Sequence, residues 1–273
     1  MADDHDHDHG AHDDLPSDEE LTGRLAGLRA AGSTDAQEWT DVGVDLADSG
    51  RVEEAEECFR AAVALGETWV AFNLGNALAD QGRLDDAAVE FQRAVDDGYE
   101  DAYVNLGVVL DELGRRDEAR AAFAAAADAG DASGLLNLGV LALEDGDTAE
   151  AERRFAAAVA AGHPDARPEL ALLLVDDGRT AEAESLLRVG VEAGEPQSML
   201  PLADLLAAGG AVAEAEALYL RAIDEGDLHA RTNLGVLYAE TDRRDDAEEQ
   251  WVLAARDGDD LAAENLREIR RYN

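Results

Sequence analysis

The residues best suited to chemistry lie at the start of the chain, where histidine alternates with aspartate in HDHDHGAHDD. Imidazole and carboxylate groups together suit zinc, nickel or copper. The alternative interpretation is a solvated polar tail whose histidines have no role, and compositional patterns of this kind favour it. The candidate metal ligands of the tail are His5, His7, His9 and His12.

Elsewhere the sequence shows no convergent set of reactive groups that would mark a catalytic centre. His163 and His229 each stand near an expected turn, and acidic pairs such as Asp85-Asp86 recur at one place in successive segments. A recurring pair indicates a helix start, where carboxylates complement exposed N–H groups, rather than a catalytic dyad. Cys58, the single cysteine, is expected to be a buried apolar residue. We predict that the chain is not an enzyme and uses no cofactor.

The charge balance is extreme, with 63 acidic residues against 22 basic ones and a formal net charge of −41. Such a surface repels nucleic acid phosphates and anionic lipid headgroups, so neither is an expected partner. Adaptation to concentrated salt and a bias in codon composition both remain open as its origin. The acidic N-terminus does not resemble a secretion signal, and no apolar run approaches the roughly 20 residues of a membrane span. The expected location is therefore the cytoplasm.

Most of the chain after this tail consists of a sequence pattern that repeats every 32 positions. Four series recur in parallel: glycine or alanine, a turn glycine, an unbroken alanine that a large apolar residue follows four positions later, and a glycine that closes each repeat. In the segment FNLGNALADQGRLDDAAVEFQRAV, apolar residues fall at helical spacing up to Gly82, which breaks the pattern. A second apolar stripe then leads to Gly98, typical of a helix end. The pattern therefore predicts that each repeat forms two helices, each followed by a turn.

The skeleton resembles the tetratricopeptide signature, W-x2-L-G-x2-Y followed by A-x3-F. Residues 39–46 read Trp-x2-Val-Gly-x2-Leu and precede Ala55 and Phe59, while Leu234-Gly235 and Tyr238 precede Ala247 and Trp251. The family repeat has about 34 residues, whereas this one is shortened at the junction between repeats, which looks like the linker of Sel1-like repeats.

The resemblance implies an all-α fold, an α/α superhelical solenoid of seven 32-residue helix-turn-helix repeats with a capping helix at each end. We expect a disordered His/Asp-rich tail over 1–16, an N-terminal capping helix over 17–35, seven repeats over 36–260 and a C-terminal capping helix over 261–273.

In relatives of this kind the first helix of each repeat lines a concave groove, which implies a protein-binding scaffold. Recurring asparagines could hydrogen-bond to a bound peptide, or could equally serve a tight contact between helices. The expected partner is a protein that is apolar with basic flanks, and its peptide or helix would lie in the groove. The alternative function is metal binding or delivery by the tail, with the solenoid as docking arm. The candidate partner-binding residues are Trp69, Phe72, Asn73, Asn76, Val104, Asn105, Val108, Leu136, Asn137, Val140 and Asn233.

Overall fold

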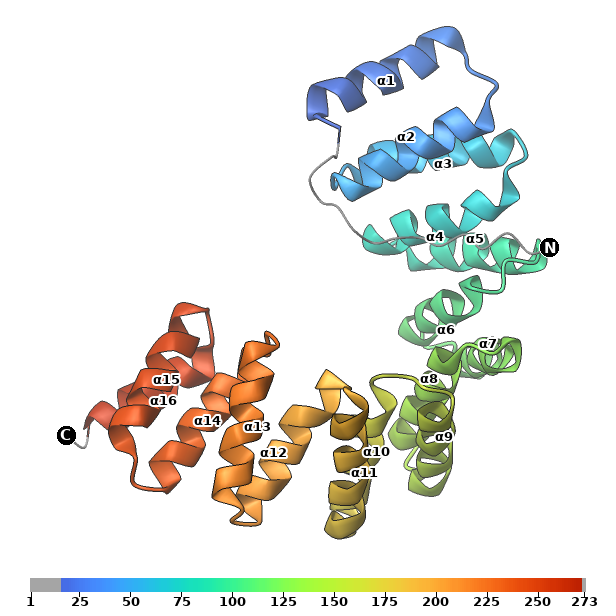
Figure 1. Cartoon of the computed structure of the whole chain (residues 1–273). Helices are drawn as coiled ribbons and strands as arrows, with labels where there is room; N and C mark the ends of the chain where they lie inside the picture. The colour runs from blue at the N-terminus through green and yellow to red at the C-terminus, as the bar shows by residue number, and fades with distance from the viewer. Residues whose placement is uncertain (1–15, 272–273) are drawn as a thin grey trace. The chain divides into compact units, whose positions relative to one another are not determined.

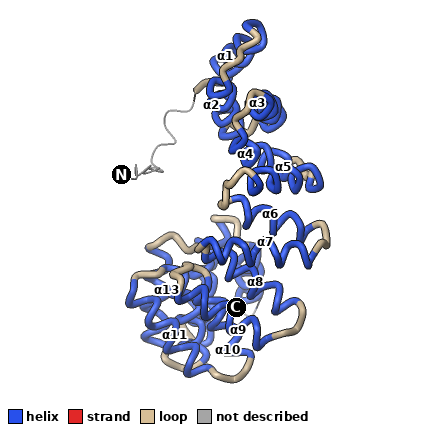
Figure 2. The backbone as a smooth tube through the Cα atoms, turned by 90° about the vertical axis from the view of Figure 1, so that its right-hand side faces the viewer, coloured by secondary structure: helices blue, strands red, loops and turns tan. Residues whose placement is uncertain are grey.

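The computed structural model describes residues 16–271, and in that range every regular element is helical (Figures 1 and 2). Short loops join the helices, which follow the order expected from the period. Their bounds are Asp18–Ala31 (α1), Ala36–Asp48 (α2), Val52–Ala64 (α3), Ala71–Asp80 (α4), Leu84–Asp96 (α5), Ala102–Glu112 (α6), Arg116–Ala129 (α7), Ala132–Glu144 (α8), Thr148–Ala160 (α9), Ala166–Asp176 (α10), Thr180–Ala193 (α11), Met199–Ala208 (α12), Val212–Asp224 (α13), His229–Glu240 (α14), Arg244–Arg256 (α15) and Asp260–Arg271 (α16).

Two single 3-10 turns, Thr68–Val70 and Pro196–Ser198, lead directly into α4 and α12. The chain divides into two compact units, residues 1–134 and 135–273, and each is described by itself. Within the described residues no helix is both long and apolar enough to cross a membrane.

Turns in both units depend on residues that adopt a left-handed backbone. Gly82 has φ +72° between the two helices of one repeat, and Gly98 has φ +92° after the second helix. Glycine adopts these angles without steric cost. At the place equivalent to Gly82 in the last expected repeat, Asp242 has φ 59°, a conformation that aspartate tolerates better than most residues. The two recurring glycine series therefore mark helix ends.

In the first unit, each pair of helices packs an aromatic ring against a glycine. Phe59 and Phe91 are buried on the second helices α3 and α5. A Cβ atom added at Gly75 would lie 2.6 Å from two ring atoms of Phe91, and one added at Gly43 would lie 2.7 Å from Phe59. Because real Cβ atoms essentially never approach so closely, alanine could not replace Gly43 or Gly75 unless the ring moved. The two helices of each repeat therefore approach closely at the glycine.

The second unit uses the same arrangement with substitutions. Gly235 in α14 contacts the indole of Trp251 in α15, where an added Cβ would overlap the ring. In α10 the equivalent position is Ala171, and the second helix opposite carries Leu187 in place of an aromatic ring. Both Ala171 and Leu187 are buried. Between α10 and α11 a methyl group therefore accompanies a smaller side chain, whereas the equivalent pair of α12 and α13 is Ala203 and Tyr219.

The predicted fold class, an all-α solenoid, is confirmed. A helix is present in each segment expected to form a cap, with α1 at Asp18–Ala31 and α16 at Asp260–Arg271. Ser17 is the N-cap of α1 and accepts a hydrogen bond from the backbone N–H of Glu20 at 3.3 Å. The count of seven repeats and the capping role of the end helices stay predictions. The tail, expected to be disordered over 1–16, lies outside the described residues except for Pro16.

Candidate functional site

A groove runs along the first helices α2, α4 and α6 of the first unit. Two pockets of about 220 and 530 Å³ open between these helices, and both are lined by Asn76 and Asp80. The buried rings of Phe59 and Phe91 form part of the floor. We call this surface the first-helix groove; its lining comprises Val44, Ala47, Asp48, Val52, Phe59, Asn73, Asn76, Ala77, Ala79, Asp80, Leu84, Phe91, Asn105, Val108, Val109 and Glu112.

Three carboxylates, Asp48, Asp80 and Glu112, stand at the rim of this groove and are exposed. Among residues 16–271 none of the three has a hydrogen bond or ion pair. No arginine lines either pocket, so the rim is not neutralised from within the described part of the chain. The groove thus combines apolar surface with uncompensated negative charge.

Four of the predicted partner-binding residues line this groove, namely Asn73, Asn76, Asn105 and Val108. Val108 is exposed, and the three asparagines are half-buried. The structure therefore brings these four side chains together on one surface.

Three other predicted residues of the first unit line neither pocket. Trp69 lies in the 3-10 turn before α4, is 40% exposed, and donates from its indole Nε1 to a carboxylate oxygen of Glu67 at 2.8 Å. The ring of Phe72 packs between two other rings, with centroid distances of 5.9 Å to Phe91 and 5.1 Å to Tyr99. Val104, at the equivalent position in α6, is half-buried. Phe72 therefore packs against aromatic rings of its own repeat and of the junction with the next one.

The asparagine series joins neighbouring first helices. Asn105 of α6 donates from Nδ2 to Oδ1 of Asn76 in α4 at 2.8 Å. In the second unit, Asn233 of α14 donates in the same way to Asp204 of α12 at 2.9 Å. Each bond occupies one amide N–H and leaves the carbonyl oxygen of the donating asparagine available. The sequence left two roles open for these asparagines, and at these two positions the asparagine makes a contact between helices.

The remaining predicted residues belong to the second unit. Leu136 and Asn137 of α8 are half-buried, and Val140 is exposed. Leu172 of α10 and Val236 of α14 are exposed at the register of Val140. At this register α8, α10 and α14 therefore present an exposed apolar residue, whereas α12 presents Asp204.

Sequence reasoning missed the groove residues Val44, Asp48, Asp80 and Glu112. A signal for them exists, because Asp48, Asp80 and Glu112 recur at the 32-residue period as the last residues of α2, α4 and α6.

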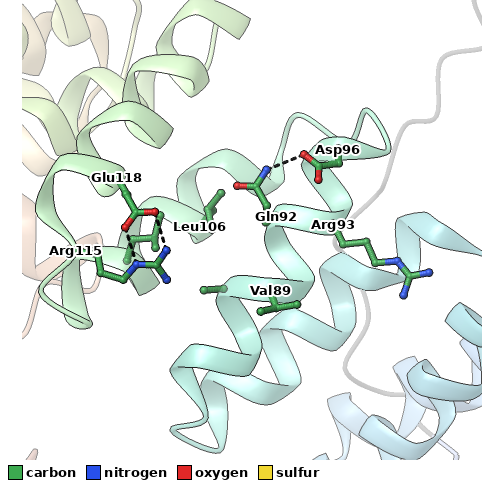
Figure 3. A pocket seen from close by; sticks show the side chains of 9 residues that line it. Val89, Gln92, Arg93, Asp96, Leu106, Arg115 and Glu118 are labelled. Atoms are coloured by element: carbon green, nitrogen blue, oxygen red, sulfur yellow. Dashed lines mark hydrogen bonds and ion pairs between the residues drawn. The ribbon is translucent and has the colours of Figure 1, made fainter.

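A third pocket, of about 410 Å³, opens between the second helices α5 and α7 over α6 (Figure 3). Figure 3 shows Arg115 bound to Glu118 on one side, and Arg93 on the opposite side beyond Val89. Val89 is 65% exposed. We call this the second-helix pocket.

The second-helix pocket exists where an ion pair between repeats is absent. Arg83 donates from Nη1 to Glu56 on the preceding second helix at 2.8 Å and from Nε to Asp86 at 3.0 Å. In the second unit Arg179 and Arg243 bridge the same two positions, to Glu152 and Glu182 and to Glu216 and Asp246. Arg115 has only Glu118, because the residue equivalent to Glu56 is Ala88.

The histidines, the acidic pair and the cysteine that the sequence analysis weighed for chemistry lie at turns, at helix starts or in the core. His163 accepts the backbone N–H of Asp165 at its Nδ1 at 3.1 Å, and His229 is the first residue of α14. Asp86 lies in the first turn of α5 and accepts a hydrogen bond from Arg83, which stands immediately before that helix. Burial raises the pKa of the Cys58 thiol to about 12, so a thiolate does not form there near neutral pH.

No group of three or more metal-ligating side chains lies within residues 16–271. His5, His7, His9 and His12 fall outside the described residues, so the metal hypothesis rests on sequence alone.

Comparison with protein families gives a match to the tetratricopeptide repeat over residues 41–98, 72–134, 136–198 and 169–229, and a second tetratricopeptide repeat model matches residues 228–252. A comparison with curated protein sequences gives no match.

Solved structures with the same fold include a tetratricopeptide repeat protein from Parabacteroides merdae, with TM-score 0.59 and 20% identity over 86% of this chain and 98% of that one. A Sel1 repeat protein from Oxalobacter formigenes has TM-score 0.57 and 21% identity over 79% and 96% of the two chains. Yeast Tom70 has TM-score 0.69 and 16% identity over 93% of this chain and 57% of its own. The predicted resemblance to the tetratricopeptide repeat is confirmed, and a Sel1 repeat protein is among the structures that share the fold.

Proposed function

The chain belongs to the tetratricopeptide repeat family, and on that premise we propose that it is a non-catalytic scaffold that binds a segment of a partner protein in the first-helix groove. The observation that carries the proposal is the groove itself, whose two pockets share an apolar floor and a rim of unpaired carboxylates. Such a surface suits a partner that offers apolar side chains with basic residues beside them. The partner is proposed to be a protein, since a net charge of −41 opposes binding to nucleic acid or anionic membranes.

Among the predicted residues, Asn73, Asn76, Asn105 and Val108 are the proposed contacts of the first unit. Asn105 keeps its carbonyl oxygen and one N–H for a bound backbone while it holds Asn76. The proposed partner contacts of the second unit are Leu136, Asn137, Val140 and Asn233. Trp69 remains a candidate anchor at the edge, because its indole is exposed beside α4. The proposed setting is the cytoplasm.

The test compares one charge change in the groove with a matched change outside it. Val108→Arg introduces a cation among the rim carboxylates, whereas Val89→Arg introduces the same residue in the second-helix pocket. Both valines are exposed, so neither change should disturb the core. Partners captured by the wild-type chain from its source cytosol are identified by mass spectrometry, and the affinity of each is then measured by calorimetry with both variants.

We expect Val108→Arg to weaken binding by about tenfold or more, as loss of a central interface contact does, and Val89→Arg to leave it unchanged. Circular dichroism melts of both variants serve as the folding control. The opposite pattern would transfer the binding surface to the second-helix pocket and refute the proposal.

A further inference from the structure

The rim carboxylates of the first-helix groove reinforce the negative ends of three helices. Asp48, Asp80 and Glu112 are the last residues of α2, α4 and α6, respectively. The carbonyl groups at a helix C-terminus carry a partial negative charge, which favours a nearby cation. None of these three helices contains an arginine or lysine. Each of these first helices therefore ends on a carboxylate that has no paired cation within residues 16–271, and these carboxylates recur once per repeat.

The packing of the first helices sets the distance between these carboxylates. The hydrogen bond from Asn105 to Asn76 shows that α6 and α4 lie side by side. Helices that pack directly have axes about 8–10 Å apart, and we take a similar spacing for equivalent carboxylates on neighbouring first helices. A polyproline II peptide has three residues per turn and rises about 9 Å in that turn. Every third side chain of such a peptide therefore matches one repeat of the groove.

Taking the proposed function as its basis, we propose that the occupant of the first-helix groove is a polyproline-II segment of a partner protein with arginine or lysine at every third position. Its three cations pair with Asp48, Asp80 and Glu112. The residues between them place apolar side chains against Val44 and Val108, which are exposed beside those carboxylates. The carbonyl oxygen of Asn105 accepts one backbone N–H of the segment.

Three peptides of one composition test the spacing. The first, Arg-Leu-Pro-Arg-Leu-Pro-Arg, has cations at every third position. The second, Arg-Leu-Arg-Leu-Arg-Pro-Pro, has them at every second position, and the third, Arg-Arg-Arg-Leu-Pro-Leu-Pro, has them together. All are acetylated and amidated, so that their net charges are equal. Affinities for the full chain are measured by calorimetry at one salt concentration in the physiological range.

Two variants of the full chain remove the same charge from different surfaces. Asp80→Asn removes the central rim carboxylate, which lines both pockets. Asp117→Asn removes a carboxylate in the first turn of the second helix α7, away from the groove lining. Neither aspartate has a hydrogen bond or ion pair within residues 16–271, so both variants should keep the fold.

We expect the peptide with three-residue spacing to bind about tenfold more tightly than either control, since each matched ion pair contributes up to about fivefold. Asp80→Asn should weaken that peptide about threefold to fivefold, and Asp117→Asn should not change its affinity. Equal binding of the three peptides, or equal effects of the two variants, would overturn the spacing and show binding by diffuse charge. If no peptide binds although Val108→Arg abolishes capture of a natural partner, the basic segment is wrong and the scaffold function stands.

Discussion

Substituting Gly75 by alanine tests whether the ring of Phe91 decides the residue opposite it. The new methyl carbon would lie 2.6 Å from both Cδ1 and Cε1 of Phe91, about 1 Å closer than ordinary contact. The ring is buried, so it cannot move without displacing other core atoms. Overpacking of this kind costs about 1–3 kcal/mol. Alanine gains about 1 kcal/mol over glycine in helix propensity, which leaves a net loss of up to about 2 kcal/mol in the free energy of unfolding.

A double-mutant cycle separates the contact from the propensity. Phe91→Leu in the Gly75→Ala background reproduces the natural pair Ala171 and Leu187 of the second unit. The leucine leaves space that the methyl group partly fills, so the double variant should be more stable than the sum of the single effects by about 1–2 kcal/mol. The matched control is Gly27→Ala in α1, where an added Cβ meets no atom within 4 Å. That change should stabilise the chain by up to about 1 kcal/mol.

The assay is urea unfolding followed by circular dichroism at fixed salt, because guanidinium chloride is itself a salt and would screen the charge of this acidic chain. Repeat proteins can unfold in more than one step, so m-values are compared before free energies are assigned. A Gly75→Ala chain as stable as the Gly27→Ala control, with a coupling energy near zero, would show that the ring yields freely and would refute the reasoning.

Four further outcomes are expected. Ala88 is buried in the wall of the second-helix pocket, so Ala88→Glu should place a carboxylate in that pocket within reach of Arg115 and raise the unfolding free energy by up to about 1 kcal/mol. Ala121→Glu at an exposed site of α7 should not, and equal urea midpoints would contradict this. Burial would raise the pKa of Glu56, but hydrogen bonds from Gln81, Arg60 and Arg83 lower it to about 2 from 4.5. Its stabilising effect is therefore complete above about pH 4.5 and lost as the pH falls towards 2, so Glu56→Gln should flatten that limb of a stability–pH curve. The melting temperature should rise with potassium chloride up to about 2 M if self-repulsion destabilises the chain, and a flat response would favour codon bias. Nickel should bind more tightly at about pH 7.5 than at about pH 5.5, in calorimetry against a chain with alanine at His5, His7, His9 and His12.

The period predicted the helices because each repeat places turn glycines and apolar stripes at the same positions, and the chain has no other way to bury those stripes than by stacking them. The direction of individual side chains on the first helix was harder to predict. Phe72 and Asn73 are neighbours in sequence and differ by about 100° around the helix. The structure turns Phe72 towards Tyr99 and Asn73 towards the groove, and only the packing of the next repeat decides between them.

The asparagines could not be assigned from one repeat alone either. Asn105 meets Asn76 across two helices, while the residue at the place of Asn76 in the preceding repeat is Val44. Asn73 therefore has no amide opposite it, although the two asparagines occupy the same position of the repeat. The role of each one depends on a residue 29 positions earlier, as the pairing of Asn105 with Asn76 shows. A pattern read within one period does not contain that information.

The arginines of the first unit are distributed unevenly between its helices, and this distribution bears on the origin of the net negative charge. Over residues 36–129 every arginine lies in a second helix or immediately before one; these are Arg51, Arg60, Arg83, Arg93, Arg115, Arg116 and Arg120. There they bind carboxylates of the same face, as Arg83 binds Glu56 and Asp86. The first helices keep their rim carboxylates uncompensated. Salt adaptation or codon bias alone would add acidic residues without regard to face. The separation instead follows the boundary between the surface that holds neighbouring repeats together and the groove proposed to receive a basic segment.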